Sequence, residues 1–338
     1  MRIFVRVPSN RPSGGVKVAN QLVNLFREKG IESFLVINSE VYSAKWMINP
    51  APVISAKDLI KTCEINDVII DNWIDRYTIE TTRKLKAKIK IYYSQGSTFY
   101  KSKNLIGDDH LKTYSIYTHY WAVSNDARKI LESNYPKTGK WYLVHPYFEQ
   151  DVITSIRENT KQRKNAILCL SRKGRSYILF AKILLEHRIR FDVINRKFTE
   201  IEIYKLMARY KFFLSTAVGV RPQYIKNVVR LLIRGRTDFV KVINPYREGF
   251  PLPPAEAALC GSIVIGFAMG GGLEWMSPST CFLAKDRSYF SLIKKVKEAL
   301  SASDEQLDTI RKNAFRAVSK FNKEHTWQQI EHFLAEAK

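Results

Sequence analysis

The chain has 338 residues, of which 45% are hydrophobic, so it can form more than one core and two domains are the first expectation. This composition excludes a disordered chain, and no apolar run approaches the ~18 residues that a membrane-spanning helix needs. A formal net charge of +23 indicates an anionic partner, such as a phosphorylated small molecule, an anionic lipid surface or a nucleic acid.

The cysteines and the first residues bear on the compartment. The four cysteines are scattered, with no Cys-x-x-Cys pair and no histidine at ligand spacing, which argues against a zinc site or a disulfide framework. The apolar run at 3–7 is not followed by the hydrophobic segment of a signal peptide. We therefore expect a protein of the reducing cytoplasm.

Short apolar runs in the first half of the chain alternate with helical patterns. After the run at 3–7, apolar side chains from Val18 to Phe26 recur at helical spacing, and Gly30 is a suitable helix terminator. We expect strands at 3–7, 33–38, 67–71, 89–93 and 120–124. Strand followed by helix, repeated, predicts a parallel sheet that is covered on both faces.

The alternation restarts after the polar stretch 157–165, which we interpret as a linker. Strands are expected at 166–170, 191–195, 212–216 and 262–266, and helices near 177–187, 200–209, 254–260, 289–300, 304–321 and 325–337. The pattern predicts an α/β protein with two Rossmann-like domains facing each other across a cleft, residues 1–156 and 157–321. The last helix, within 322–338, is expected to pack back on the first domain.

Two segments concentrate the positive charge. They are 83–90 and 221–241, and in the second one six Lys or Arg residues accompany a single acid, Asp238. Such a run forms either a binding surface or an ordinary solvated helix face, and the sequence leaves both open.

Glu248 and Glu256 lie eight positions apart in the stretch 247–261, with three prolines between them. On one helix they would be about 12 Å apart, but the prolines prevent that arrangement. We therefore expect Glu248 in a loop and Glu256 in the first turn of a helix that starts at Pro254, where an anion is favoured. Spacing alone leaves two interpretations open: a pair of acceptors for a phosphorylated, hydroxyl-rich ligand, or a helix-capping glutamate beside an unrelated loop residue.

The stretch 248–276 resembles the donor-binding signature of retaining glycosyltransferases of family 4, which have the GT-B fold. That signature reads E-G-F-x-L-x-x-x-E, followed by a short helix, a buried strand and G-G-x-x-E. The matching residues are Glu248, Gly249, Phe250, Leu252, Glu256, Gly271, Gly272 and Glu274. The stretches YKFFLSTA, ILCLSRKGRS and RPSGGVKVANQLVNLFREKG resemble further parts of the family's two domains, so the likeness spans most of the chain.

The resemblance implies a role for each matched position. Glu256 would accept hydrogen bonds from the ribose hydroxyls of a nucleoside-diphosphate sugar, and Glu248 would contact the transferred sugar. Backbone N–H groups around 250–253 and at 271–272 would approach the sugar and phosphates closely, because glycine has no Cβ.

The cations and the first glycines would serve the diphosphate. Arg172 and Lys173 would neutralise the leaving group, and because the family usually separates these two residues, Arg175 is a third candidate. Gly14 and Gly15 would let the first helix reach the same diphosphate. Ordinary surface charge and a simple strand-to-helix turn are the respective alternatives.

Two regions depart from the family pattern. A basic insertion near 218–246 precedes Glu248 where the family has only a few residues; it is either an acceptor or membrane-surface element or a surface helix without a role. The first domain lacks the histidine that some relatives use near the sugar. Gln95, Asp109 and His110 are the acceptor-side candidates.

The resemblance implies transfer of a hexosyl group, with retention, from a UDP-sugar or similar donor to a hydroxyl acceptor. The acceptor would be a carbohydrate or a lipid-linked molecule, in polysaccharide, lipid-linked oligosaccharide or glycolipid synthesis. No DxD-type motif is found, so we expect neither metal nor cofactor. The positive charge would serve anionic donors and peripheral docking on the inner face of an anionic membrane.

Other functions stay open at this stage. An enzyme of the same fold could epimerise or phosphorolyse a sugar instead. A polyanion-binding or nucleic-acid-binding protein would fit the charge, but no recognisable nucleic-acid module is found, and we expect no nucleic-acid partner. A catalytically idle GT-B scaffold is the third alternative.

Overall fold

The computed structural model describes residues 1–7, 12–38, 44–72, 76–96, 115–170, 189–194, 198–215, 249–268, 270–285 and 289–336. The chain divides into two compact units, residues 1–148 together with 321–338, and residues 149–320. The sequence placed the boundary later, at 156/157. The difference arises because helix α6 (Gln150–Glu158) packs against helices of the second unit, so the polar stretch at 157–165 is a surface connection inside that unit.

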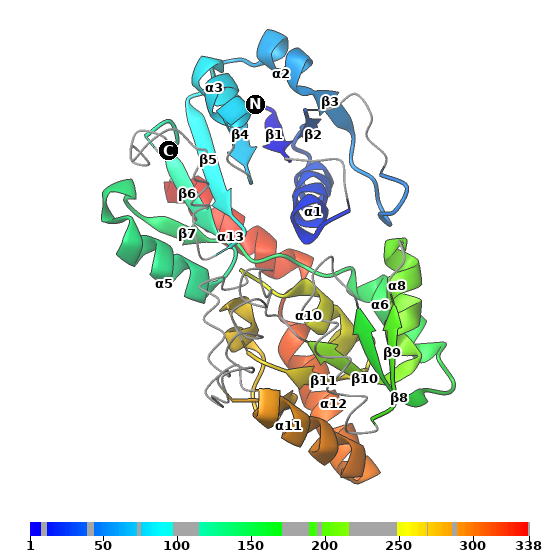
Figure 1. Ribbon diagram of the computed structural model, residues 1–338. Helices are drawn as coiled ribbons and strands as arrows, with labels where there is room; N and C mark the ends of the chain where they lie inside the picture. The colour runs from blue at the N-terminus through cyan, green and yellow to red at the C-terminus, as the bar shows by residue number, and fades with distance from the viewer. Residues whose placement is uncertain are drawn as a thin grey trace, which may run out of the picture. The chain divides into compact units, whose positions relative to one another are not determined.

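The first unit is built on a sheet of seven parallel strands in the order β3-β2-β1-β4-β5-β6-β7 (Figure 1). The strands are β1 (Ile3–Arg6), β2 (Ser33–Ile37), β3 (Val53–Ser55), β4 (Val68–Asp71), β5 (Ile89–Ser94), β6 (His119–Ala122) and β7 (Trp141–Leu143). The helices are α1 (Gly14–Glu28), α2 (Ala56–Thr62), α3 (Arg76–Lys84), α5 (Asn125–Asn134) and the 3₁₀ turn η1 (Pro136–Thr138). The five strands expected from the sequence are confirmed, whereas β3 and β7 were not predicted.

Helix α1 forms as its sequence dictates and lies across β1 and β2. The Ser13 side chain accepts a hydrogen bond from the Val16 amide at 3.3 Å and so caps the N-terminus. Apolar residues such as Leu22 and Phe26 are buried, and the Phe26 ring lies 6.3 Å from that of Trp327. Gly30, at φ +78°, ends the helix in the left-handed conformation that glycine adopts readily.

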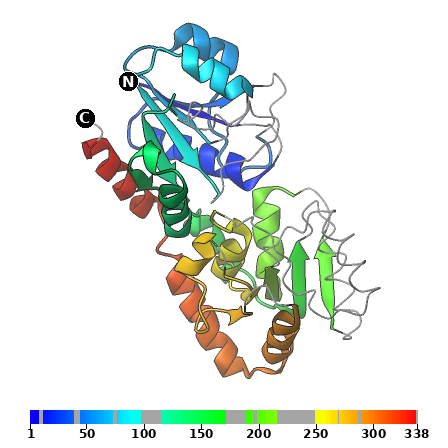
Figure 2. The same cartoon turned by 60° about the vertical axis from the view of Figure 1, so that its left-hand side comes forward.

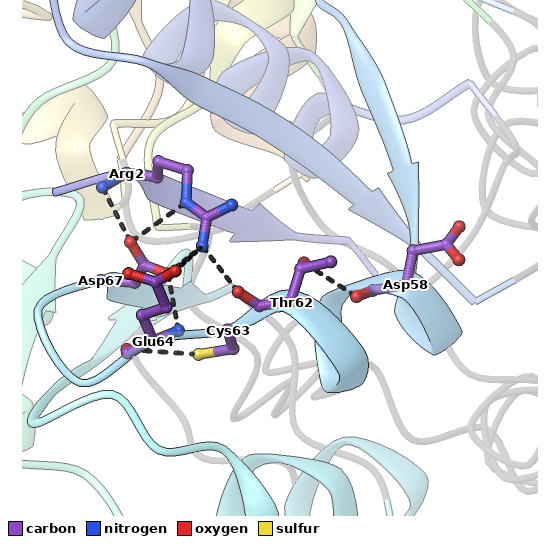
Figure 3. A network of polar contacts seen from close by, with 6 residues as sticks. All are labelled: Arg2, Asp58, Thr62, Cys63, Glu64 and Asp67. Atoms are coloured by element: carbon purple, nitrogen blue, oxygen red, sulfur yellow. Dashed lines mark hydrogen bonds and ion pairs between the residues drawn. The ribbon is translucent and has the colours of Figure 1, made fainter.

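A polar network closes the amino end of this sheet (Figure 3). Asp67 accepts hydrogen bonds from the Arg2 backbone at 3.0 Å, the Arg2 guanidinium at 2.8 Å and the Glu64 amide at 2.8 Å. The same guanidinium donates to the Thr62 carbonyl at 2.6 Å. The starts of β1 and β4 and the end of α2 are therefore tied together at the edge opposite to the carboxyl ends of the strands.

Helix α13 (Lys323–Glu336) belongs to the first unit, although it is the last element of the chain. Figures 1 and 2 both show it, in red, beside β6 and β7. Phe333 is fully buried, with its ring 5.2 Å from that of Trp121 and 5.0 Å from that of Tyr142. Gln329 accepts a hydrogen bond from the His145 amide at 2.8 Å. Helix α13 therefore covers part of the unit's core.

The second unit has five parallel strands in the order β12-β11-β10-β8-β9. The strands are β8 (Lys164–Leu170), β9 (Phe191–Ile194), β10 (Tyr210–Ser215), β11 (Ile263–Gly266) and β12 (Phe282–Leu283). Besides α6, its helices are α8 (Glu200–Ala208), α10 (Leu252–Leu259), the 3₁₀ turn η2 (Gly270–Glu274), α11 (Tyr289–Ser301) and α12 (Asp304–Val318). Its main core packs the sheet against α11 and α12, with Phe212, Ile265, Leu292 and Leu307 among its buried members. None of the helices in the described part of the chain has the length and apolar character to cross a membrane.

Candidate active site

The carboxyl ends of β10 and β11 lie on the same side of the second sheet, which we call its carboxyl edge. The predicted donor residues follow these two strands. The two strands lie close together at Gly266, where an added Cβ would be only 2.5 Å from the Ser215 carbonyl oxygen. Residues 249–251 enter this edge ahead of α10, and η2 follows β11. In a parallel α/β sheet this edge is where ligands bind.

Gly249 and Phe250 close over Gly271, a contact that we call the glycine clasp. The Gly271 amide donates to the Gly249 carbonyl at 2.6 Å. A Cβ on Gly271 would lie 2.4 Å from Cδ2 of the Phe250 ring, so no other residue fits without movement. Gly272 is less confined, since its Cβ would meet the Met276 sulfur at 3.2 Å and Pro251 at 3.3 Å. The structure thus brings together residues that the sequence placed more than twenty positions apart.

Helix α10 begins at Leu252, two residues before the predicted start. Pro253 and Pro254 occupy its second and third positions, where the missing N–H groups have no partner to lose. Glu256 therefore lies in the second turn, and the prediction that it sits in the first turn is wrong. From the sequence we expected the free amides of the helix terminus to stabilise this carboxylate, but Glu256 lies too far along the helix for that.

Glu256 is buried, with 6% of its surface exposed, and it faces helix α8. The Tyr204 hydroxyl lies 3.5 Å from Glu256 Oε1 and donates to Glu200 Oε1 at 2.8 Å. Burial, together with the negative charges of Glu256 and Glu200, raises the pKa of Tyr204 well above its usual value. The phenol therefore stays protonated and acts as a donor between two carboxylates. No sequence pattern pointed to Tyr204 or Glu200.

In the first unit, Gly15 is held at the carboxyl edge of the sheet. Its carbonyl accepts hydrogen bonds from Asn72 Nδ2 at 3.1 Å and from Gln95 Nε2 at 3.4 Å. A Cβ on Gly15 would lie 2.7 Å from Gln95 Oε1. Gly14 precedes it as the first residue of α1. Two predicted candidates, Gly15 and Gln95, are thus in contact, and Asn72 joins them without having been predicted.

A buried ion pair lies beside them, at the ends of β1 and β4. Arg6 Nε is 3.4 Å from Asp71 Oδ1, and both side chains are almost fully buried. Asp71 Oδ2 also accepts hydrogen bonds from Thr82 at 2.7 Å and from the Tyr117 hydroxyl at 2.9 Å. Strand order reverses between β1 and β4, which is the usual ligand position in such sheets. An arginine inside the apolar run at 3–7 was the one sequence signal for this pair.

Comparison with solved structures identifies the architecture. The chain is similar to HepE from Anabaena in complex with UDP-glucose (TM-score 0.64, 14% identity, covering 99% of this chain and 100% of that one). It is also similar to the pneumococcal O-GlcNAc transferase GtfA in complex with UDP and GlcNAc (0.66, 9%, 99% and 99%) and to a glycosyltransferase from Rickettsia africae (0.69, 13%, 99% and 98%). The chain has the GT-B fold. No protein-family model and no curated protein sequence matches it.

Several predicted residues of this GT-B chain lie outside the described residues. They are Glu248, Arg172, Lys173, Arg175, Asp109 and His110, together with the insertion near 218–246 and the helix expected at 177–187. Within the described residues, no group of three or more His, Cys, Asp or Glu side chains is placed to hold a metal ion. The described candidate residues therefore form two separate groups: the glycine clasp with Leu252 and Glu256 in the second unit, and Gly15 with Gln95 and Asn72 in the first.

Proposed function

We propose that the chain is a glycosyltransferase that moves a hexosyl group from a nucleoside-diphosphate sugar, preferably a UDP-sugar, to a hydroxyl acceptor. One observation carries the proposal: the glycine clasp lies at the carboxyl edge of the second sheet, followed directly by α10 with its buried Glu256. These residues belong to the stretch that resembles the donor signature. The full-length likeness to glycosyltransferase structures, two of them with UDP compounds, supports the same reading.

Each site residue has a role that follows from its chemistry. Glu256 accepts hydrogen bonds from the two ribose hydroxyls, because an ionised carboxylate is an acceptor with two oxygens. Glu248 contacts hydroxyls of the transferred sugar. Arg172 and Lys173, with Arg175 as the third candidate, neutralise the diphosphate as its charge develops in the transition state.

The reaction is proposed to retain the configuration at the anomeric carbon. The bond from that carbon to the diphosphate oxygen breaks, and the acceptor oxygen attacks the same face of an oxocarbenium-like centre. The departing phosphate oxygen takes the acceptor's proton, so neither an enzyme nucleophile nor a metal ion is needed. Proton NMR of the first product, read at the anomeric signal, tests retention, and loss of activity with a chelator that divalent cations restore would contradict metal independence.

The donor assignment is tested by thermal shift with UDP-glucose, UDP-GlcNAc and GDP-mannose. Wild type is expected to be stabilised by one of these donors, since a ligand that binds only the folded state raises its melting temperature. Glu256→Ala should abolish the shift. Glu305→Ala, which removes an exposed glutamate at the start of α12, should keep it. A wild type that none of the donors stabilises would contradict the proposal.

The acceptor is proposed to be a carbohydrate or a lipid-linked molecule, reached by docking on an anionic membrane. The formal charge of +23 supports docking, because each Lys or Arg near an anionic surface contributes roughly 1 kcal/mol. Pelleting with vesicles of phosphatidylglycerol, compared with vesicles of phosphatidylcholine, tests this. Equal pelleting with both vesicle types would remove the membrane from the proposal.

The same charge favours a second candidate, a polyanion-binding protein. Such a protein would bind RNA or DNA with an affinity that falls steeply as salt rises. It would give no turnover of any nucleotide-sugar. Filter binding at two salt concentrations, run beside the donor screen, separates the two functions.

A further inference from the structure

Two buried carboxylates of the second unit meet at one buried hydroxyl. Tyr204 is fully buried, and its hydroxyl donates to Glu200 Oε1 at 2.8 Å while lying 3.5 Å from Glu256 Oε1. Glu200 and Tyr204 stand on α8, whereas Glu256 stands on α10, and the two helices pack together. A contact that joins residues so far apart in the chain depends on the tertiary fold and not on local sequence.

The distances show how the hydroxyl is used. A phenol has one hydrogen to donate, and the shorter contact assigns it mainly to Glu200. The longer contact is the weaker share of the same donor, directed to Glu256 Oε1 at 3.5 Å. The hydroxyl thereby confines the Glu256 carboxylate in position.

We propose that Tyr204, anchored by Glu200, is a positioning residue that fixes the Glu256 carboxylate for the two neighbouring hydroxyls of a nucleotide ribose. This inference rests on the proposed function, which assigns the ribose to Glu256. It adds that discrimination between ribose and 2′-deoxyribose depends on a tyrosine of another helix. Two adjacent hydroxyls match the two oxygens of one carboxylate only while that carboxylate is held in one orientation.

Replacing Tyr204 by phenylalanine removes the hydroxyl and keeps the ring. Glu200 and Glu256 then lose the donor that the Tyr204 hydroxyl supplies to both, and their like charges favour movement of Glu256 away from its present orientation. The measurement is calorimetric binding of UDP and of 2′-deoxy-UDP. We expect wild type to bind UDP about tenfold more tightly than the deoxy compound, and Tyr204→Phe to bring this ratio close to one.

Tyr210→Phe is the matched control. Its hydroxyl also donates to a carboxylate, Asp192 Oδ2 at 2.6 Å, but Tyr210 begins β10 and so lies at the opposite edge of the sheet. This variant should keep the wild-type ratio. A ratio is read within one protein sample, so a partial loss of folded protein does not change it.

The outcomes separate the inference from the function on which it rests. If wild type binds neither compound, the proposed UDP donor and the role of Tyr204 are both overturned. Suppose instead that wild type prefers UDP to 2′-deoxy-UDP, that Glu256→Gln loses this preference and that Tyr204→Phe keeps it. In that case only the positioning role of Tyr204 is overturned.

A second variant covers the case in which Tyr204→Phe does not fold. Glu200→Gln keeps an acceptor for the phenol but removes the charge that attracts its hydrogen. The hydroxyl then turns toward Glu256 and occupies one of its oxygens, so the UDP preference should fall, by about threefold. An unchanged preference in this variant would contradict the anchoring role of Glu200.

Discussion

At the scale of single residues, the glycines of the site are required for space and not for an unusual backbone. Gly271 is not one of the described glycines with a positive φ, but the Phe250 ring can lie against it because it has no Cβ. Gly15 is confined in the same way by Gln95. Both positions therefore require glycine because a side chain packs where a Cβ would lie.

Gly271→Ala is therefore expected to open the glycine clasp. The added methyl group would lie 2.4 Å from the Phe250 ring and 2.9 Å from the Gly249 carbonyl, so the loop must move. Overpacking of this kind costs about 1–3 kcal/mol, and donor binding should weaken with it. Thermal unfolding and the donor shift measure both effects. Gly96→Ala is the control, because an added methyl there meets nothing within 4 Å, and equal losses in the two variants would contradict the clasp.

Asp67 gives a prediction about acid stability. Burial by itself raises the pKa of this carboxyl group, but hydrogen bonds from Arg2 and from the Glu64 backbone outweigh it and hold the pKa below its usual value of 3.8. A group with a lowered pKa in the folded state stabilises the protein above the pKa of the unfolded state. That stabilisation is lost as the pH falls below about 4, through the lower folded pKa.

The variant Asp67→Asn should lose about 2 kcal/mol of unfolding free energy at pH 7, since hydrogen bonds to charged groups are worth roughly this much. Its stability should also change less than that of wild type between pH 5 and pH 3, because the titrating group is gone. Urea unfolding at several pH values measures both. Asp58→Asn is the control, because Asp58 is exposed and joins the network through its backbone carbonyl, which accepts a hydrogen bond from Thr62 at 2.9 Å, and not through its carboxylate (Figure 3). Parallel pH curves for wild type and Asp67→Asn would contradict the assignment.

At the level of helices and strands, apolar runs of four or more residues predicted the central strands, whereas shorter strands were not predicted. The strands β3, β7 and β12 were missed because each has only two or three residues and lies at the edge of its sheet, so no apolar run marks it. The start of α10 was misplaced because prolines mark a helix start without fixing which of the first positions they occupy. Tyr204 and Asn72 could not be predicted, since their partners are far away in sequence.

Arg163 couples two helix ends in the second unit. Its guanidinium donates to the Ala208 carbonyl at the end of α8 at 2.7 Å and to the Cys260 carbonyl after α10 at 3.0 Å. Arg163→Met keeps most of the stem and removes both bonds, and we expect a loss of about 2 kcal/mol in the stability of this unit. Hydrogen exchange of the α8 and α10 peptides should rise. Lys161→Met removes the same charge from an exposed position and should leave the exchange of these peptides unchanged. Unchanged exchange in Arg163→Met would contradict a role for its two hydrogen bonds.

At the scale of the whole molecule, the alternation of strands and helices predicted two parallel α/β units because each repeat is local. The boundary between the units was harder to predict, because no sequence feature of α6 assigns this helix to the first or the second unit. Its contacts with α8 and α10 assign it to the second. The net charge of +23 is likewise a property of the whole chain and names no surface. Placement of α13 with the first unit has a local cause as well, namely a buried aromatic face that includes Trp327 and Phe333.

That face makes the stability of the first unit depend on the last residues of the chain. Phe333 contacts the rings of His119, Trp121 and Tyr142 at 5.0 to 5.2 Å, and Phe333→Ala would leave a cavity among them. Such truncations cost about 3–5 kcal/mol. Hydrogen exchange should therefore accelerate in β6 and β7, in the first unit, and stay unchanged in β8 and β10, in the second.

Phe290→Ala is the matched control, because that ring is 75% exposed on α11 and its loss should change neither unit. Acceleration confined to α13 itself would show that the helix only rests on the sheet. Acceleration in β6 and β7, with the second unit unaffected, would show that a residue more than 180 positions downstream of His145 completes the core of the first unit.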